Sequence, residues 1–172
     1  MNEQEKFWKG SFGNSYIKRN QKKLIKNNFI LFKKIFNKVR LSKINSIIEF
    51  GANIGNNLHA LKKLKKNLSH LTAVEINKNA CKILKKDFKN IKIINKPIVK
   101  FRSSNKYNLT IVKGILIHIN PKDLNKIYKI IFDSSNKYIL IAEYYSQKPV
   151  KIDYRGFKNK LFKRDFAGEF LK

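Results

Sequence analysis

The sequence predicts an α/β fold with a doubly wound parallel sheet, and three features indicate it. First, a short apolar run from Ser46 to Phe50 leads into a turn that contains Gly51 and Gly55. Second, leucines recur at helical spacing directly after that turn. Third, further apolar runs alternate with helical patterns along the rest of the chain. Strands joined by helices of this length pair in parallel, and the helices cover both faces of the sheet.

The elements can be predicted in order from their residue patterns. Residues 3–20 are interrupted by Gly10 and Gly13, which excludes one long helix, and they form either a helical cap on the core or a flap over a ligand. Helices are expected at about 20–40, after Gly55 as far as Leu68, from a cap at Asn77, and from Asn120-Pro121. Strands are expected at 46–50, 71–76, 91–95, 107–112 and 138–142, the last of them fully buried.

Composition bounds the class of protein. The 172 residues are enough for one domain with a substantial core. A single cysteine, Cys81, excludes an internal disulfide and any multi-cysteine zinc site, and no metal is expected. No apolar stretch approaches the ~20 residues that span a bilayer, and the N-terminus lacks the basic and apolar regions of a signal peptide. We therefore expect a soluble cytoplasmic protein with no membrane partner.

The net charge of +28 has two interpretations. The first interpretation is an RNA or DNA partner, because basic surfaces bind nucleic acids by releasing counterions. However, the charge comes from 34 lysines and only 5 arginines, with frequent asparagine and isoleucine, which indicates a genome biased toward A and T. Proteins that read bases and phosphates specifically favour arginine. A solvated lysine surface is therefore favoured over a dedicated nucleic-acid interface.

The turn after the first strand predicts a nucleoside ligand without phosphates. A dinucleotide-binding loop has the pattern Gly-x-Gly-x-x-Gly, and here Asn53 and Asn56 fill the second and third glycine positions. A phosphate-binding P-loop would need Lys-Ser/Thr after its last glycine, which this turn lacks. The second strand ends at Glu75, 24 residues after Gly51, where a carboxylate can bind ribose hydroxyls.

The pattern Glu49-x-Gly51-x-x-x-Gly55, followed by the acid Glu75, resembles class I methyltransferases, the Rossmann-like enzymes that use S-adenosylmethionine (SAM). Four stretches are more narrowly similar to the methyltransferases associated with pseudaminic acid biosynthesis. They are Glu5 to Gly10 with Tyr16 to Asn20, the glycine turn, Lys113 to Pro121, and Tyr154 to Gly156 with Leu161 to Gly168. The last two stretches are the most particular to that family.

The resemblance implies a cofactor site and an acceptor site within one methyltransferase domain, 1–172. SAM is the implied cofactor, held by Glu49, Gly51, Asn53, Gly55, Glu75 and Lys113. The implied acceptor is a pseudaminic acid-type nonulosonic sugar or its activated form, bound by Tyr16, Glu143, Tyr144, Tyr154, Arg155 and Arg164. Residues 1–45 would then be an N-terminal helical cap, 46–145 the SAM-binding Rossmann core and 146–172 an acceptor-side segment.

His118 is the candidate catalytic base. Methylation of a hydroxyl group needs a base near the end of the fourth strand, and His118 lies in that stretch of sequence. An equally good interpretation is a histidine fixed by a hydrogen bond to nearby backbone. Cys81 lies on a helix instead of at a strand end and is expected to be inert. Lys96-Pro97 follows the third strand where SAM enzymes usually present a polar or acidic side chain, so recognition of adenine is left unassigned.

Two other functions stay open. An RNA or DNA methyltransferase would use the same SAM site, but enzymes that methylate amino groups carry Asp/Asn-Pro-Pro-aromatic after the fourth strand, where this chain has Lys113-Gly114-Ile115-Leu116. Methylation of carbon 5 of a pyrimidine would need a cysteine nucleophile, for which Cys81 is badly placed. The other alternative is a catalytically silent SAM-fold protein that binds a partner.

The C-terminal part is expected to be short. Class I methyltransferases usually follow the fifth strand with a helix and two more strands, but only 29 residues follow Glu143. The prediction is a five-strand sheet ordered 3-2-1-4-5, no strand pattern after residue 146, and a terminal helix that begins near Asp165. The outer edge of the fifth strand would then be unpaired.

Overall fold

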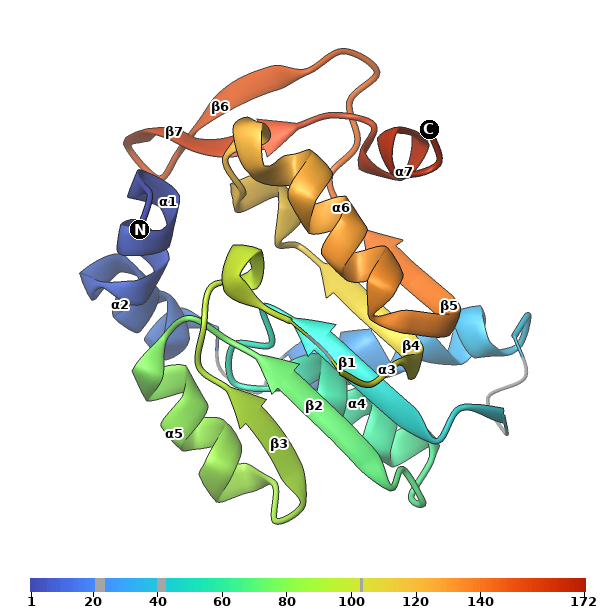
Figure 1. Ribbon diagram of the computed structural model, residues 1–172. Helices are drawn as coiled ribbons and strands as arrows, with labels where there is room; N and C mark the ends of the chain where they lie inside the picture. Colours follow the sequence, from blue (N-terminus) through green and yellow to red (C-terminus); the bar gives the residue numbers. More distant parts are fainter. Residues whose placement is uncertain (21–23, 40–42, 103) are drawn as a thin grey trace.

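The computed structural model describes residues 1–20, 24–39, 43–102 and 104–172. Its centre is a parallel sheet of five strands in the order β3-β2-β1-β4-β5 (Figure 1). The strands are β1 (Ser46–Phe50), β2 (His70–Val74), β3 (Ile91–Ile94), β4 (Tyr107–Lys113) and β5 (Ser135–Ala142). The predicted fold class and strand order are confirmed.

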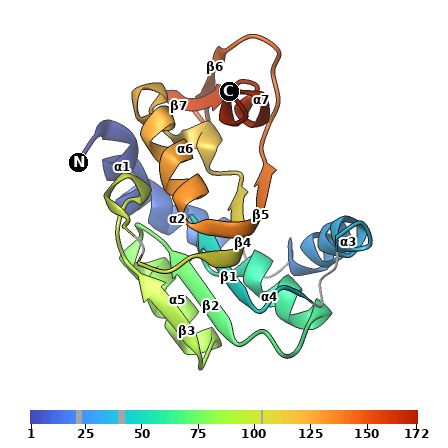
Figure 2. The same ribbon diagram turned by 45° about the vertical axis from the view of Figure 1, so that its right-hand side comes forward.

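Helices cover both faces of this sheet (Figures 1 and 2). On one face pack α3 (Leu24–Phe36), α4 (Asn56–Leu64) and α5 (Lys78–Asp87), and on the other pack α6 (Leu124–Asp133) and the short 3-10 helix η2 (Ile98–Lys100). β1 contributes Ile47 to the apolar cluster on the first face and Ile48 to the cluster on the second. Burial on both faces explains why its sequence is apolar without alternation.

Several boundaries differ from those that the sequence predicts. Of the helix expected at about 20–40, α3 is observed, and residues 21–23 and 40 lie outside the described residues. α4 ends at Leu64, so Leu68 belongs to the loop that follows the helix, although its side chain is buried. The predicted start at Asn120-Pro121 forms a 3-10 turn, η4 (Pro121–Asp123), in which the Asn120 side chain accepts a hydrogen bond from the amide of Lys122.

The prediction of a fully buried fifth strand is wrong. The residues of β5 from Tyr138 to Ala142 are all partly exposed. The reason is topological, because β5 is an edge strand and no described strand pairs with its outer side. An edge strand keeps one row of backbone groups and part of each flanking side chain in contact with solvent.

The N-terminal helices and a C-terminal hairpin lie together over the carboxyl ends of the strands (Figures 1 and 2). The N-terminal end forms α1 (Glu3–Lys9) and α2 (Ser11–Arg19), which are separated at Gly10. The C-terminal end forms an antiparallel hairpin of β6 (Val150–Tyr154) and β7 (Phe157–Lys163), followed by α7 (Phe166–Phe170). We refer to α1, α2 and the hairpin together as the cover.

The prediction of no strand pattern after residue 146 is wrong, because β6 and β7 form a separate two-stranded sheet. Most side chains of the hairpin are exposed and only residues 160–162 are buried, so it carries little hydrophobic periodicity. A terminal helix near Asp165 is confirmed, and the Asp165 side chain caps it by accepting a hydrogen bond from the amide of Gly168 at 2.9 Å. Within the described ranges, no helix is long and apolar enough to cross a bilayer.

Candidate cofactor and acceptor sites

The turn between β1 and α4 is built from residues with left-handed backbone. Gly51, Asn53 and Gly55 have φ angles of 69°, 47° and 81°. Asparagine is one of the few residues other than glycine that visit this region, which explains how Asn53 can stand where a dinucleotide loop has glycine. The amide of Gly51 donates to the carbonyl of Val74 at 2.8 Å, and this bond ties the turn to the end of β2.

The two glycines of the turn have different neighbours. A Cβ atom on Gly51 would lie 2.0 Å from Cδ1 of Ile115, at the edge of the two cavities described below. A Cβ atom on Gly55 would lie 2.7 Å from Leu84 and 2.8 Å from Phe88. Gly55 therefore allows α4 to pack against α5, whereas Gly51 allows the Ile115 side chain to pack against the turn beside the cavities.

Glu75 fixes the turn from the end of β2. Its Oε2 accepts a hydrogen bond from the amide of Asn53 at 2.8 Å, and its Oε1 accepts one from the amide of Asn77 at 2.7 Å. The residue is only 7% exposed, and burial raises the pKa of its carboxyl group. Each carboxylate oxygen has a second lone pair, so Glu75 can still accept hydrogen bonds from a ligand.

A first cavity, which we call the cofactor cavity, lies at the carboxyl ends of β1 and β2. Gly51, Asn53 and Glu75 line it on the side of the core. The side-chain oxygen of Asn53 is buried and has no hydrogen-bond partner among the described residues. The apolar wall is formed by Ile76, Pro97 and Ile98, and α1 closes the far side with Asn2, Gln4, Glu5 and Trp8. The cavity thus offers both polar and apolar contacts to one ligand.

A second cavity, which we call the acceptor cavity, lies on the other side of the same turn. It shares Gly51, Asn53 and His118 with the cofactor cavity. Its other polar residues come from the ends of β4 and β5, from α2 and from the hairpin, and they include Tyr16, Lys113, Glu143, Tyr144 and Tyr154. The resemblance assigns Lys113 to the cofactor, whereas the structure gives it a place in the acceptor cavity.

His118 lies where the two cavities meet. It ends the 3-10 helix η3 (Leu116–His118), which follows β4, and it is 8% exposed. Its Nδ1 lies 2.7 Å from the carbonyl oxygen of Lys160 on β7, so Nδ1 carries the proton and Nε2 is left as an acceptor. Burial lowers the pKa of His118 to about 4, and the side chain is neutral at pH 7. The rings of Trp8 and Tyr154 pack against the imidazole, with centroid distances of 4.6 and 4.8 Å.

Two further carboxylates are buried behind the cavities, and burial raises the pKa of each to about 7. Glu49 lines neither cavity; its Oε1 accepts a hydrogen bond from Asn57 at 2.6 Å, and its Oε2 has no partner among the described residues. Glu143 lines the acceptor cavity and accepts hydrogen bonds from the amides of Ile115 and Leu116 at 2.8 and 3.0 Å. Glu143 therefore holds the segment that leads to His118.

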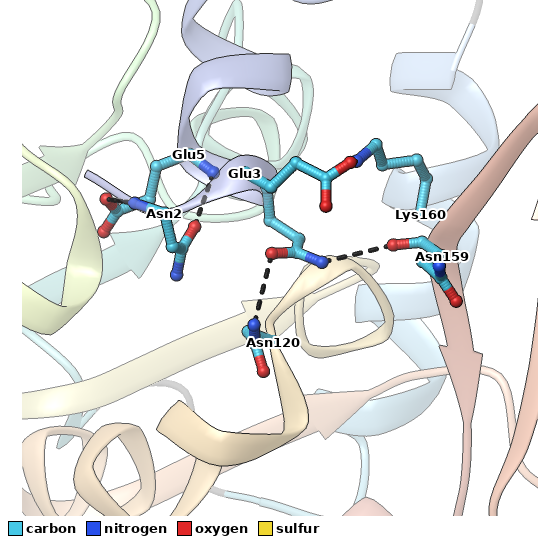
Figure 3. A network of polar contacts seen from close by, with 7 residues as sticks. Asn2, Glu3, Glu5, Asn120, Asn159 and Lys160 are labelled. Atoms are coloured by element: carbon cyan, nitrogen blue, oxygen red, sulfur yellow. Dashed lines mark hydrogen bonds and ion pairs between the residues drawn. The ribbon is translucent and has the colours of Figure 1, made fainter.

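Polar contacts fasten α1 to the rest of the fold, and Figure 3 shows the pair of Glu3 with Lys160 among them. Nδ2 of Asn2 donates to Asp123 at 2.7 Å, and Glu3 forms an ion pair with Lys160, the residue whose carbonyl holds His118. The aromatic residues of this segment predict a flap as one alternative, but no local pattern marks its polar residues as part of a ligand site. Trp8 in particular reaches His118 only through the tertiary packing of α1.

Some predicted site residues are not brought to either cavity. Arg155 lies in the turn between β6 and β7, and Arg164 donates from Nε to Glu169 of α7 at 2.6 Å. Cys81 is buried on α5, 3.5 Å from the carbonyl of Glu75, and burial raises the pKa of its thiol to about 11. In the part of the chain that the structure describes, no group of three or more His, Cys, Asp or Glu residues could hold a metal ion.

The chain is similar to known methyltransferases in both sequence and structure. The family model for ribosomal RNA adenine dimethylase matches residues 13–142. An rRNA adenine N-6-methyltransferase from Limosilactobacillus reuteri is 33% identical over 133 residues, and the match covers 72% of this chain and 52% of that protein. The chain therefore spans about half the length of this curated relative.

Similar solved structures share the fold at low sequence identity. The plantazolicin methyltransferase BpumL, bound to a substrate analogue and SAH, has a TM-score of 0.67 and 16% identity, with 82% of this chain and 57% of that chain covered. An O-methyltransferase of a Brevibacillus brevis multienzyme, bound to S-adenosylhomocysteine, has a TM-score of 0.64 and 14% identity, with 93% and 54% covered. The sugar N-methyltransferase KedS8 from Streptoalloteichus has a TM-score of 0.64 and 10% identity, with 86% and 62% covered.

Proposed function

Because this chain belongs to the ribosomal RNA adenine dimethylase family, we propose that it binds SAM in the cofactor cavity and transfers the methyl group to a ligand in the acceptor cavity. The observation that carries this proposal is that the two cavities share Gly51, Asn53 and His118. A donor in one cavity and an acceptor in the other would meet at these residues. Holding two reactants in contact is the main contribution that a protein makes to a displacement reaction.

The residues of the cofactor cavity fit SAM. Gly51 lines the cavity with backbone that can face the methionine part, and the unpartnered oxygen of Asn53 can accept a hydrogen bond from its amino group. Glu75 can accept hydrogen bonds from the two ribose hydroxyls, and the wall of Ile76, Pro97 and Ile98 suits an adenine ring. When bound, SAM supplies an electrophilic methyl group on a sulfonium. The core residues then orient it, and the cover excludes water.

The acceptor that we propose is a nonulosonic sugar of the pseudaminic acid type or its activated form. Such a sugar carries a carboxylate and several hydroxyls. The acceptor cavity offers the ammonium of Lys113 for the carboxylate, and the phenols of Tyr16, Tyr144 and Tyr154 for hydroxyls. The segment after β4 reads Lys113-Gly114-Ile115-Leu116 and lacks the Asp/Asn-Pro-Pro-aromatic pattern of amino-methylating enzymes, which also favours a hydroxyl acceptor.

His118 is the proposed base for this hydroxyl. The backbone carbonyl of Lys160 holds the proton on Nδ1 and orients the ring, while Nε2 keeps its lone pair for the acceptor. The two interpretations of His118 from the sequence thus describe one side chain, fixed to backbone through one nitrogen and available through the other. A pKa of about 4 makes it a weak base, so positioning of the acceptor carries more of the rate than proton removal does.

Methylation of RNA is the second candidate, because the curated relative is an rRNA adenine N-6-methyltransferase. Transfer of tritium from methyl-labelled SAM to nonulosonic sugars, nucleotide-activated sugars and RNA separates the candidates. We expect label on a sugar hydroxyl. Label on RNA alone would mean that RNA is the acceptor and that the proposed sugar is not. SAM binding without transfer to any of these acceptors would favour a catalytically silent binding protein.

A further inference from the structure

A shallow groove lies in the cover, where α1, α2 and the turn between β6 and β7 meet. Three cationic side chains from these three elements line it: Lys6, Arg19 and Arg155. No carboxylate lines the groove, and none of the described carboxylates forms an ion pair with these side chains. Cations gathered on one small surface repel one another until an anion joins them.

The choice of arginine in this groove is not explained by composition. The chain has 5 arginines and 34 lysines, and two of the five arginines line the groove. Arg19 lies over the Phe12 ring, 5.2 Å from its centroid, and Arg155 lies 6.0 Å from the centroid of Tyr154. These two rings contact each other at 5.7 Å, so one aromatic cluster carries both guanidinium groups. A stacked guanidinium keeps its N–H edge free for paired hydrogen bonds to a phosphate.

The backbone of Arg155 supports the same conclusion. Arg155 and Gly156 form the two-residue turn of the hairpin, with φ angles of 52° and 82°. A turn with positive φ at both central residues favours Asn-Gly, so arginine is a strained choice at position 155. Residues held in such conformations cluster at functional sites. The conformation of the hairpin turn therefore does not explain why an arginine stands at position 155.

The groove adjoins the acceptor cavity. On α2, Tyr16 lines the cavity and Arg19 lines the groove; on the hairpin, Tyr154 lines the cavity and Arg155 lines the groove. Burial raises the pKa of Tyr16, while Arg155 and Arg19 act in the opposite direction, which places both charges within electrostatic reach of this phenol. A ligand that fills the cavity and passes these two tyrosines reaches both guanidinium groups.

We propose that this groove binds the phosphate group of an acceptor that is linked to a phosphate or a nucleotide. The inference rests on the proposed function, because the acceptor cavity would hold the remainder of the same molecule. A phosphate ester presents oxygens to the two guanidinium groups and to the ammonium of Lys6. A phosphate backbone of RNA fits less well, because the arginines gather at one short groove beside the acceptor cavity instead of along a track.

The test is calorimetric binding of a defined probe, uridine 5′-monophosphate, to the wild-type chain and to Arg19→Gln and Arg155→Asn. Each variant should bind the probe about tenfold or more weakly, as expected for a lost charge-assisted hydrogen bond. Arg155→Asn should melt at the same temperature or higher, because asparagine suits the turn. Lys126→Gln, which removes one exposed charge from α6, is the matched control and should bind the probe like the wild type.

Unchanged probe affinity in both arginine variants would overturn the proposal, and so would absence of probe binding to the wild type. Affinity that rises with the length of single-stranded RNA and falls equally in Lys126→Gln would assign the charge to RNA instead. SAM affinity, measured in the same variants, should be unchanged. SAM affinity reports on the cofactor cavity alone. Loss of the phosphate-binding proposal and loss of the proposed methyltransferase function would therefore give different results.

Discussion

The core and the cover are held in place by different interactions. The helices of the core bury large apolar side chains against both faces of the sheet, at ~1.5–3 kcal/mol for each fully buried side chain. Of the cover, β7 joins the core cluster through Leu161, whereas α1 and α2 are fastened by a cluster of aromatic rings and by polar pairs, such as Asn2 with Asp123 and Glu3 with Lys160. Partly exposed polar pairs contribute only ~0–1 kcal/mol each. We therefore expect α1 and α2 to detach more easily than the helices of the core.

This difference separates two kinds of contact that a ligand makes in the cofactor cavity. The cofactor cavity has its floor on the core, at Gly51 and Glu75, and its roof on the cover, at Trp8. Contacts with the core are expected to set the affinity for SAM. Contacts with the cover are expected to set how long the ligand stays and how well water is excluded.

The largest expected effect is therefore in the core, at Gly51. Gly51→Val should weaken SAM binding by more than ~100-fold, or ~2.7 kcal/mol. An added Cβ would lie 2.0 Å from Cδ1 of Ile115, and the φ of 69° is unfavourable for valine. Gly114→Val is the matched control, because its φ is 65° but no atom lies within 4 Å of an added Cβ. Calorimetry should show near-normal SAM affinity for the control; normal affinity for Gly51→Val would mean that the ligand lies elsewhere.

The next effect is at Glu75. Glu75→Ala should weaken SAM binding by ~10- to 100-fold, since a hydrogen bond to a charged group contributes ~1.5–3 kcal/mol. The same change removes the acceptor that fixes the amide of Asn53, so part of the loss comes from a looser turn. Glu75→Gln keeps one side-chain oxygen, so its affinity for SAM should lie between that of the wild type and that of Glu75→Ala. Unchanged affinity by calorimetry would contradict the assignment of the ribose to Glu75.

The same contrast explains what the sequence could predict. The five strands and their order were predictable because a parallel strand buried on both faces appears as a continuous apolar run. The hairpin was not, because its exposed side chains leave no such run. The partial burial of β5 depends on which strand ends at the edge of the sheet, and that depends on contacts beyond any local window.

The candidate site follows the same rule. Gly51, Asn53 and Glu75 could be assigned because they follow directly from strand ends, and parallel strands bring their carboxyl ends together. Trp8 could not be assigned, because it reaches the cofactor cavity only when α1 docks on the core. Lys113 could be placed at a strand end, but the cavity that it lines could not be predicted, because both cavities border the carboxyl edge of the sheet.

His118 connects the core with the cover. It lies on η3, which follows β4 of the core, and the carbonyl of Lys160 on β7 of the cover orients its ring. His118→Ala should lower turnover ~10-fold, below the ~10²–10⁴-fold of a base matched to neutral pH, with SAM affinity nearly unchanged. In the wild type, protonation of His118 should lower the rate only as the pH falls toward its pKa of about 4, because the protonated ring cannot accept a proton. Protonation of Glu143, with a pKa of about 7, should affect the wild type and His118→Ala alike, so the difference between their pH profiles reports on His118. A difference centred near ~6.5 would show an exposed imidazole in the working enzyme.

The pKa of His118 also predicts a pH dependence of stability. The folded-state pKa, about 4, lies below the ~6.5 of an unfolded chain, so the unfolded state binds more protons between these values. The contribution of His118 to the free energy of unfolding is therefore present above pH ~6.5 and lost as the pH falls through about 4. Urea titrations of the wild type and His118→Ala should show a smaller loss in the variant over this window. Parallel loss in both would assign the acid sensitivity to other groups.

The smallest expected effect is in the cover, at the ion pair of Glu3 with Lys160. Glu3→Gln should speed dissociation of SAM about two- to fivefold, or ~0.2–1 kcal/mol, because the Glu3 side chain is 71% exposed and the glutamine oxygen can still accept from Lys160, whose side chain is only 6% exposed. Asp133→Asn breaks the exposed pair with Lys129 on α6, far from the cover in sequence, and is the matched control with no expected change in rate. Stopped-flow displacement of SAM measures both variants. Lys160→Met in the Glu3→Gln background should restore part of the slow dissociation, since it removes a buried ammonium that the neutral glutamine oxygen pairs less strongly than the carboxylate does. If Glu3→Gln instead lowers the melting temperature as much as a substitution in the apolar core, then the cover and the core unfold as one unit, and the division between them fails.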